Sequence, residues 1–216
     1  MFVALQCHSL LYCTMDDTRF VSPATIILSG TTSSGKSTWI ERFLQQNMFD
    51  VKPDKIYYCY GVYQKKFEDM PHVNFIHGLP DSFTQFHGSR HNLIIIDDLQ
   101  DEVANSKAVE QLFTRESHHR NLSVVYINQN LFYQGKHSRT IALNTHYTIL
   151  FRNPRANSQL RILRSQTGLK HLDEAYNDVM KHNRFGYLVI DLSPYSKTEY
   201  KLRTQIFPNE DLIIYE

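Results

Sequence analysis

The sequence contains few cysteines and no long apolar run, and each shortage excludes a class of protein. The three cysteines form no CxxC pair, so we expect neither a disulfide framework nor a structural zinc site. This cysteine usage favours a reducing compartment. No apolar stretch approaches the roughly 20 residues that a membrane helix requires, and we therefore expect no membrane span and no membrane partner.

A large excess of charge is missing as well. Lys and Arg number 23 and Asp and Glu number 22, which gives a formal net charge of +1. A protein coated in basic surface for nucleic acid would carry a clear positive excess, so any contact with DNA is expected to be local. The 11 histidines are scattered without the spacing of metal ligands, and we interpret them as surface or core residues.

The length and composition fit one globular domain. A chain of 216 residues, 42% of them hydrophobic, is long enough for one core and short for two. We expect a domain over 21–216, preceded by a leader of unassigned structure over 1–20. This leader lacks a basic region and polar residues interrupt it, so we do not expect secretion. Met15 is an alternative start.

Segments of strand and helix character alternate along most of the chain. Short apolar runs of strand length occupy residues 24–29, 55–60, 73–76, 93–99, 122–130 and 146–151. Apolar residues at helical spacing predict helices after the first run and over 64–69, 101–117, 157–165 and 169–182. The alternation predicts βαβ units, and hence an α/β three-layer sandwich with a mostly parallel central sheet.

The C-terminal part of the chain has a different pattern. An apolar run occupies 186–192, and within 200–207 apolar residues alternate with polar and charged ones. A period of two is typical of a strand with one face in solvent. We therefore predict a half-exposed antiparallel hairpin formed by these two segments.

The stretch GTTSSGKST follows the first apolar run directly and satisfies the pattern GxxxxGK[ST]. Its glycines allow a tight turn whose N–H groups point at phosphate oxygens at the start of a helix. We expect Lys36 to neutralise the β- and γ-phosphates of ATP and Ser37 to ligate Mg²⁺. The residues expected to contact the nucleotide are Gly30, Thr31, Thr32, Ser33, Ser34, Gly35, Lys36, Ser37 and Thr38. The alternative is a turn that only caps a helix.

Two aspartates, Asp97 and Asp98, end the buried strand predicted from residue 93. A phosphate loop requires a second, acidic element that holds the magnesium ion. We expect Asp97 to ligate the metal, usually through its water, and Asp98 to polarise the attacking water as general base. The alternative is that these side chains cap the next helix, which aspartate does well.

The run 122–130 ends in two amides, Asn128 and Gln129. Ligands bind at the carboxyl ends of parallel strands, so we expect Gln129 to contact the γ-phosphate or orient water. Amides are common where a strand passes into a loop. An ordinary strand end therefore explains the pattern equally well.

Four arginines are candidates for a finger that reaches the γ-phosphate of a neighbouring subunit. They are Arg115, Arg120, Arg139 and Arg152. For any one of them, an ordinary surface arginine is the simpler interpretation. The loop 133–140 also carries Lys136 and His137, a set of cations suited to a phosphate backbone. A solvated charged loop is the alternative.

Five blocks in this order resemble one family: SGTTSSGKSTWIERFLQ, LIIIDDL, LFTRESHHRNLSVVYINQNLF, LNTHYTILFRNPR and GYLVIDLSP. The chain is similar, over about residues 20–208, to the genome-packaging ATPases of the FtsK/HerA superfamily. The similarity is to those of virophages, Polinton-like elements and adintoviruses, and more distantly to the poxvirus packaging ATPase. The first two blocks are generic, whereas RESHHRNLSVVYINQ and THYTILFRNPR are specific to the family.

The resemblance implies a RecA-like P-loop core in which the strand of Gln129 lies between the P-loop strand and the strand of Asp97. It implies an ATP- and Mg²⁺-dependent motor, a homo-oligomeric ring that threads double-stranded DNA into a capsid. A capsid or portal-vertex protein is then a partner, and the virion or the host-cell site of virus assembly is the location.

The family pattern transfers to the active-site residues unevenly. Lys36, Ser37, Asp97 and Gln129 match it well. Many relatives have glutamate where Asp98 stands, so this chain departs from the family pattern by a shorter side chain at the position of the base. Several arginines compete for the finger, and the resemblance favours Arg115, then Arg120.

Two other functions fit a P-loop chain of this length. A small nucleoside or nucleotide kinase would transfer the phosphoryl group to a second substrate, and a non-hydrolysing module would only bind nucleotide. The double-aspartate strand beside a strand ending in amides favours hydrolysis. No NKxD-like motif for guanine is present, so we expect ATP.

Overall fold

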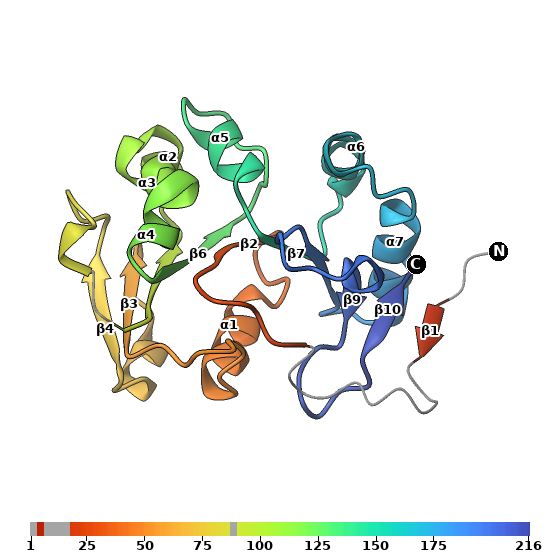
Figure 1. Cartoon of the computed structure of the whole chain (residues 1–216), viewed down its shortest axis with the longest axis horizontal. Coiled ribbons are helices and arrows are strands. Elements are labelled where there is room, and N and C mark those ends of the chain that lie inside the picture. Colours follow the sequence, from red (N-terminus) through yellow and green to blue (C-terminus); the bar gives the residue numbers. More distant parts are fainter. Residues whose placement is uncertain (1–3, 7–17, 87–89) are drawn as a thin grey trace.

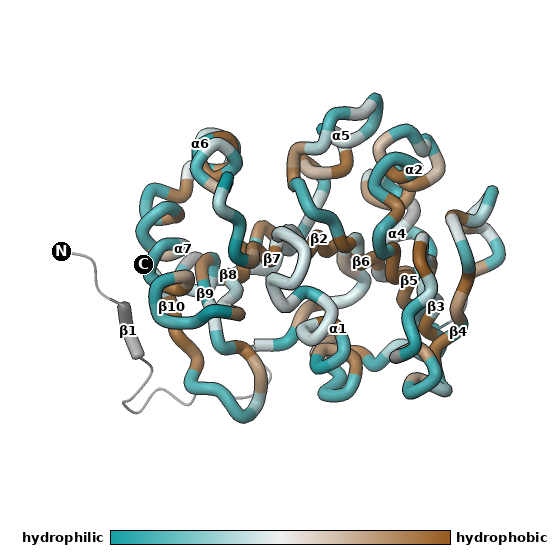
Figure 2. Tube along the Cα trace, turned by 180° about the vertical axis from the view of Figure 1, so that it is seen from behind, coloured by the Kyte–Doolittle hydropathy of each residue, from teal (hydrophilic) through white to brown (hydrophobic). Residues whose placement is uncertain are grey.

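A computed structural model describes residues 4–6, 18–86 and 90–216, and one mixed sheet runs through this part of the chain (Figure 1). Its parallel part contains, in spatial order, β7 (Tyr147–Phe151), β2 (Thr25–Ser29), β6 (Leu122–Asn128), β5 (Asn92–Asp97), β3 (Lys55–Tyr60) and β4 (Val73–His77). Every residue of β2, β5 and β6 is buried, as expected for parallel strands between two layers of helices. Figure 2 shows these central strands as mainly hydrophobic.

The strand order confirms one expectation that positions the site. β6 lies between β2, which leads into the P-loop, and β5, which ends at Asp97. The register pairs Ser29 with Asn128 and Ile127 with Asp97. Because parallel strands end at the same edge of a sheet, the P-loop, the aspartates and the amides meet there.

The other part of the sheet is antiparallel. It contains β8 (Tyr187–Asp191), β9 (Leu202–Thr204), β10 (Ile213–Tyr215) and β1 (Ala4–Gln6), and β8 pairs with β7. The predicted hairpin is therefore confirmed. Its half-exposed character is wrong, because β9 lies between β8 and β10 and all three of its residues are buried. The buried Arg203 donates a hydrogen bond of 2.8 Å to Asp191, which compensates its charge.

Helices cover both faces of the sheet, which makes three layers (Figure 1). One face carries α1 (Lys36–Gln45). The other carries α2 (Gln100–Asn105), α3 (Lys107–Gln111), the π-helix η4 (Leu112–Glu116), α4 (Ser117–His119), α5 (Ser138–Leu143), α6 (Ala156–Thr167) and α7 (Leu172–His182). The 3₁₀ turns are η2 (Lys65–Asp69), η3 (Thr84–Phe86) and η5 (Thr198–Tyr200). Among the described residues, no helix is both long and apolar enough to cross a bilayer.

The single helix predicted over 101–117 is wrong, because the chain breaks once, at Ser106: α2 ends before this residue, and α3, η4 and α4 follow one another without interruption after it. Ser106 has an extended backbone, and its hydroxyl accepts the N–H of Val109 at 3.2 Å, which starts a new helix. The predicted apolar stripe nevertheless faces the core, since Ala104, Val109 and Leu112 are buried.

The predicted leader falls partly within the described residues. Ala4–Gln6 pairs with β10, and Phe20 is fully buried against α1. The N–H of Phe20 donates to the carbonyl of Met48 at 2.8 Å. Residues 1–3 and 7–17, with Cys7, Cys13 and Met15, lie outside the described residues. Phe20 therefore contributes to the core that α1 covers.

Candidate functional site

The P-loop connects β2 to α1, and both glycines of its motif have a structural reason. Gly35 caps α1 with φ of 104°, a conformation that L-residues with side chains rarely adopt. At Gly30, an added Cβ would lie 2.6 Å from the Cβ of Phe151. The loop therefore requires glycine at each position.

Lys36 lies folded over its own loop. Its Nζ donates hydrogen bonds to the carbonyls of Gly30 at 2.6 Å and Thr31 at 2.9 Å. Burial lowers the pKa of Lys36 below its usual value, and the nearby carboxylates of Asp97 and Asp98 oppose that shift. The cation is thus held between the loop and the acidic residues.

A cavity of about 330 Å³ lies beside the P-loop at the ends of β5 and β6. Its lining brings together Lys36, Ser37, Asp97, Asp98 and Gln129. We name it the acidic cavity. Thr32 and Ser33 line it as well, so the structure places seven of the predicted site residues around one space, although they come from three separate parts of the sequence.

Asp97 is held by a tyrosine that sequence reasoning missed. The Tyr58 hydroxyl donates a 2.7 Å hydrogen bond to Oδ2 of Asp97, and both residues are buried. Burial, and then the charge of Asp97, raise the pKa of Tyr58 far above its ordinary value, so the phenol keeps its proton. The segment KIYYCY has the pattern of a strand. Its pairing with β5, which brings Tyr58 to Asp97, joins distant parts of the sequence and has no local signal.

Asp98 and Gln129 are exposed at the mouth of the acidic cavity. Asp98 has φ of 57°, so the chain turns sharply after β5. The N-cap of α2 is Leu99, so neither aspartate occupies the N-cap position. Gln100, another residue that sequence reasoning missed, accepts the N–H of Gln129 at 3.1 Å through Oε1.

The donor set of the acidic cavity fits ATP and Mg²⁺. Ser37 and Asp97 offer the oxygen ligands that Mg²⁺ prefers. Oδ1 of Asn128 is buried and has no hydrogen-bond partner among the described residues, as suits a wall that faces a polar ligand. The described residues contain no group of three His, Cys, Asp or Glu side chains able to hold a metal.

Among the described residues that line the acidic cavity there is no arginine. Arg115 is exposed on η4, and Arg139 is exposed on α5. The guanidinium of Arg152 donates to the carbonyls of Met180 and, at 3.4 Å, Asn183 at the end of α7. Arg152 therefore has a role within its own chain.

The loop 133–140 differs from its expected form. Ser138 begins α5, so the loop is shorter than predicted. His137 is buried, and its Nδ1 lies 2.7 Å from Oε2 of Glu110, so this histidine is not presented to a phosphate backbone. Lys136 and Arg139 remain exposed.

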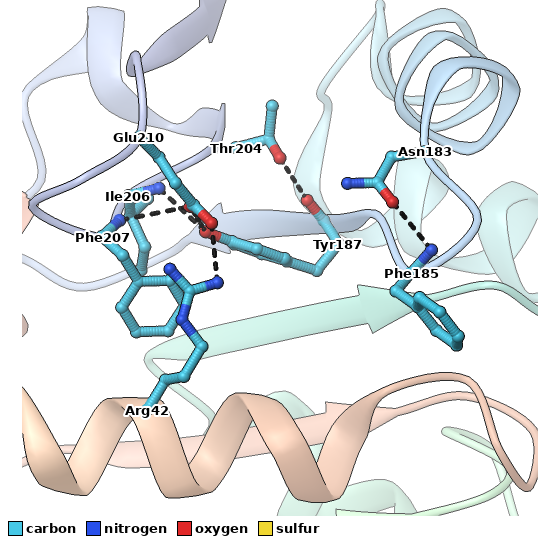
Figure 3. Close-up of polar contacts among 8 residues, drawn as sticks. All are labelled: Arg42, Asn183, Phe185, Tyr187, Thr204, Ile206, Phe207 and Glu210. Atoms are coloured by element: carbon cyan, nitrogen blue, oxygen red, sulfur yellow. Dashed lines mark hydrogen bonds and ion pairs between the residues drawn. The ribbon is translucent and has the colours of Figure 1, made fainter.

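A second cavity, of about 620 Å³, lies on the other side of the P-loop, toward β7 and β8. We name it the aromatic cavity. Its lining includes Gly35 and Thr38 of the P-loop motif together with Phe185, Tyr187 and Glu210, three residues that sequence reasoning missed. Figure 3 shows Arg42 of α1 approaching Glu210, with Phe185 on the turn before Tyr187.

Comparison with solved structures identifies the architecture. The genome packaging NTPase B204 from Sulfolobus turreted icosahedral virus 2, in complex with AMPPCP, has a TM-score of 0.53 and 14% identity, over 94% of this chain and 98% of that one. The chain has a RecA-like P-loop fold. The ATP-gammaS and sulfate complexes of the same NTPase give a TM-score of 0.50 and 15% identity, over 89% of this chain and 96% of theirs.

At these identities the likeness shows the fold alone. No protein-family model matches the chain. No curated protein matches it either. Any functional conclusion therefore depends on the residues of the site.

Proposed function

We propose that this protein is a Mg²⁺-dependent ATPase motor that hydrolyses ATP to translocate double-stranded DNA into a viral capsid. One observation carries the proposal: Lys36, Ser37, Asp97, Asp98 and Gln129 line the same cavity at the end of the P-loop strand. A cation, two carboxylates and an amide around a phosphate loop are the groups that ATP hydrolysis requires.

The P-loop supplies the binding of the triphosphate. Its backbone N–H groups and the start of α1 favour phosphate oxygens. Lys36 would exchange its present bonds to loop carbonyls for the β- and γ-phosphates. Ser37 and Asp97 would hold Mg²⁺, which when bound neutralises the charge of the phosphates.

Asp98 and Gln129 would act on the attacking water. Asp98 is exposed at the cavity mouth, where its carboxylate would accept a proton from the water as general base. Gln129 would orient the same water. Tyr58 positions Asp97 by its hydrogen bond, which stiffens the metal side of the cavity.

The motor function requires several copies and DNA. The resemblance to FtsK/HerA packaging ATPases supports a homo-oligomeric ring, in which Arg115 or Arg120 of one copy completes the site of the next. The solved structure of similar fold is described as a genome packaging NTPase. Exposed Lys136 and Arg139 offer local positive charge for the DNA backbone. A capsid or portal-vertex protein is the expected partner at the site of virus assembly.

The deciding experiment is steady-state phosphate release by the purified protein, with and without double-stranded DNA and with and without Mg²⁺. We expect Mg²⁺-dependent release that DNA stimulates and that Lys36→Ala abolishes. ATP binding without phosphate release, even with DNA, would identify a non-hydrolysing module. A phosphorylated nucleoside in place of free phosphate would identify a kinase.

A further inference from the structure

The aromatic cavity and the acidic cavity meet along the P-loop. Ser33, Lys36 and Ser37 line both of them. A ligand whose phosphates lie along this loop, with its terminal phosphate toward Asp98, therefore extends its other end into the aromatic cavity. With a volume of about 620 Å³, that space is large enough for a small organic group.

Phe185 stands at this cavity with 54% of its surface exposed. Single exposed apolar residues are common and need no explanation by themselves. The position of this one is specific, because a Cβ added to Gly35 would lie 3.5 Å from the Cβ of Phe185 and 3.6 Å from its Cδ1. The aromatic side chain thus lies against the last glycine of the P-loop.

The turn that carries Phe185 is fixed by hydrogen bonds. The N–H of Phe185 donates to Oδ1 of Asn183 at 2.9 Å, and the N–H of Gly186 donates to the carbonyl of Asn183 at 3.1 Å (Figure 3 shows the first). Arg152 links this turn to the P-loop. Its guanidinium donates to the Asn183 carbonyl, while its own carbonyl accepts the N–H of Thr31 at 3.3 Å. The backbone that carries the ring is therefore fixed beside the P-loop before any ligand binds.

The far wall of the aromatic cavity contains polar side chains that hydrogen-bond to one another. Glu210 accepts hydrogen bonds of 2.7 Å from Arg42 and from the Tyr187 hydroxyl (Figure 3). The guanidinium of Arg42 also lies 4.0 Å from the ring centroid of Phe207. Because these groups already satisfy one another, the wall supplies shape and the ring of Phe185 supplies the exposed contact surface.

We propose that the aromatic cavity receives the nucleoside end of the nucleotide, with the purine base stacked on Phe185. This inference rests on the proposed function, which places the triphosphate on the P-loop. Stacking on an aromatic ring tolerates any base, because every base has a π-face. Phe185 therefore adds affinity for ATP and GTP alike and does not select between them.

The test compares ligands with and without a nucleoside. The dissociation constants of ATP, GTP and inorganic tripolyphosphate are measured by isothermal titration calorimetry for the wild-type chain and three variants. Phe185→Ala should weaken the binding of ATP and of GTP by about tenfold or more and leave the dissociation constant of tripolyphosphate unchanged. Phe185→Tyr keeps the ring and should keep the affinity. Tyr195→Ala, at an aromatic residue that is 73% exposed, is the matched control and should change nothing.

Each contrary result has a distinct meaning. If Phe185→Ala leaves ATP binding unchanged while tripolyphosphate still binds in a Lys36-dependent manner, the nucleoside inference is wrong and the proposed function survives. An equal loss of affinity for ATP and for tripolyphosphate would show that the ring stabilises the P-loop and does not contact the base, which also overturns the inference. If the wild-type chain binds neither ligand, the proposed function and this inference fail together.

Discussion

The two cavities that flank the P-loop differ in how they are built. The acidic cavity draws Asp97, Asn128 and the P-loop from the ends of neighbouring parallel strands. The aromatic cavity draws its walls from α1, from the turn before β8 and from the segment after β9. The first therefore follows from the order of the parallel strands, whereas the second depends on how the antiparallel part of this sheet packs beside α1.

Lys36→Ala should produce the largest effect, because it removes the cation that both cavities share. We expect phosphate release to be abolished, with weaker binding of ATP and of tripolyphosphate. Phosphate release and calorimetry measure the two effects. Lys107→Ala, at an exposed lysine, is the control. Undiminished turnover in Lys36→Ala would mean that the P-loop does not hold the reacting phosphates.

Arg115→Ala tests whether the acidic cavity is completed by a neighbouring copy. An arginine finger contributes about a thousandfold or more to turnover, so the variant alone should be nearly inactive. Mixing it with Asp98→Asn subunits should restore part of the activity, because some sites then combine an intact base with an intact finger. Absence of rescue across mixing ratios would favour a structural role for Arg115.

Asp98→Asn should separate binding from chemistry within the acidic cavity. The amide cannot accept the proton of the attacking water, so turnover should fall by about a hundredfold or more while ATP affinity is retained. Asp98→Glu keeps a carboxylate and should preserve part of the activity. Normal phosphate release by Asp98→Asn would transfer the role of base to another residue.

Tyr58→Phe should weaken the metal side of the acidic cavity without touching the nucleoside side. Removing the hydroxyl frees the Asp97 carboxylate from its 2.7 Å hydrogen bond. The Mg²⁺ concentration for half-maximal activity should then rise about tenfold. Tyr57→Phe, one residue earlier in β3, is the matched control. An unchanged Mg²⁺ requirement would show that Tyr58 serves only packing.

Arg42→Met should have the smallest effect, and on stability. The Arg42–Glu210 pair is partly exposed, with side-chain exposures of 35% and 22%, and such pairs contribute less than about 1 kcal/mol. Methionine keeps an apolar stem near Phe207. Urea denaturation should show a small decrease in the midpoint, whereas a large decrease would mean that this wall holds the antiparallel strands to α1.

Several elements were predictable because their signal is local. The P-loop motif, the double aspartate and the amides after β6 each occupy a few consecutive residues, and the shared edge of a parallel sheet brings them together. The break at Ser106 and the burial of Arg203 were not predictable. Hydrophobic periodicity does not reveal that the Ser106 hydroxyl caps a new helix. It also does not reveal that Asp191 in the adjacent strand pairs with Arg203 and so allows its burial.

The amino-acid sequence by itself determined the α/β class, the phosphate loop and the acidic residues opposite it, because strand periodicity and motif spacing act over short distances along the chain. Only the tertiary structure decided that Tyr58 holds Asp97 and that Phe185 lies against Gly35. Those contacts join residues far apart in the sequence. They arise from the order of strands in the sheet, which no local pattern encodes.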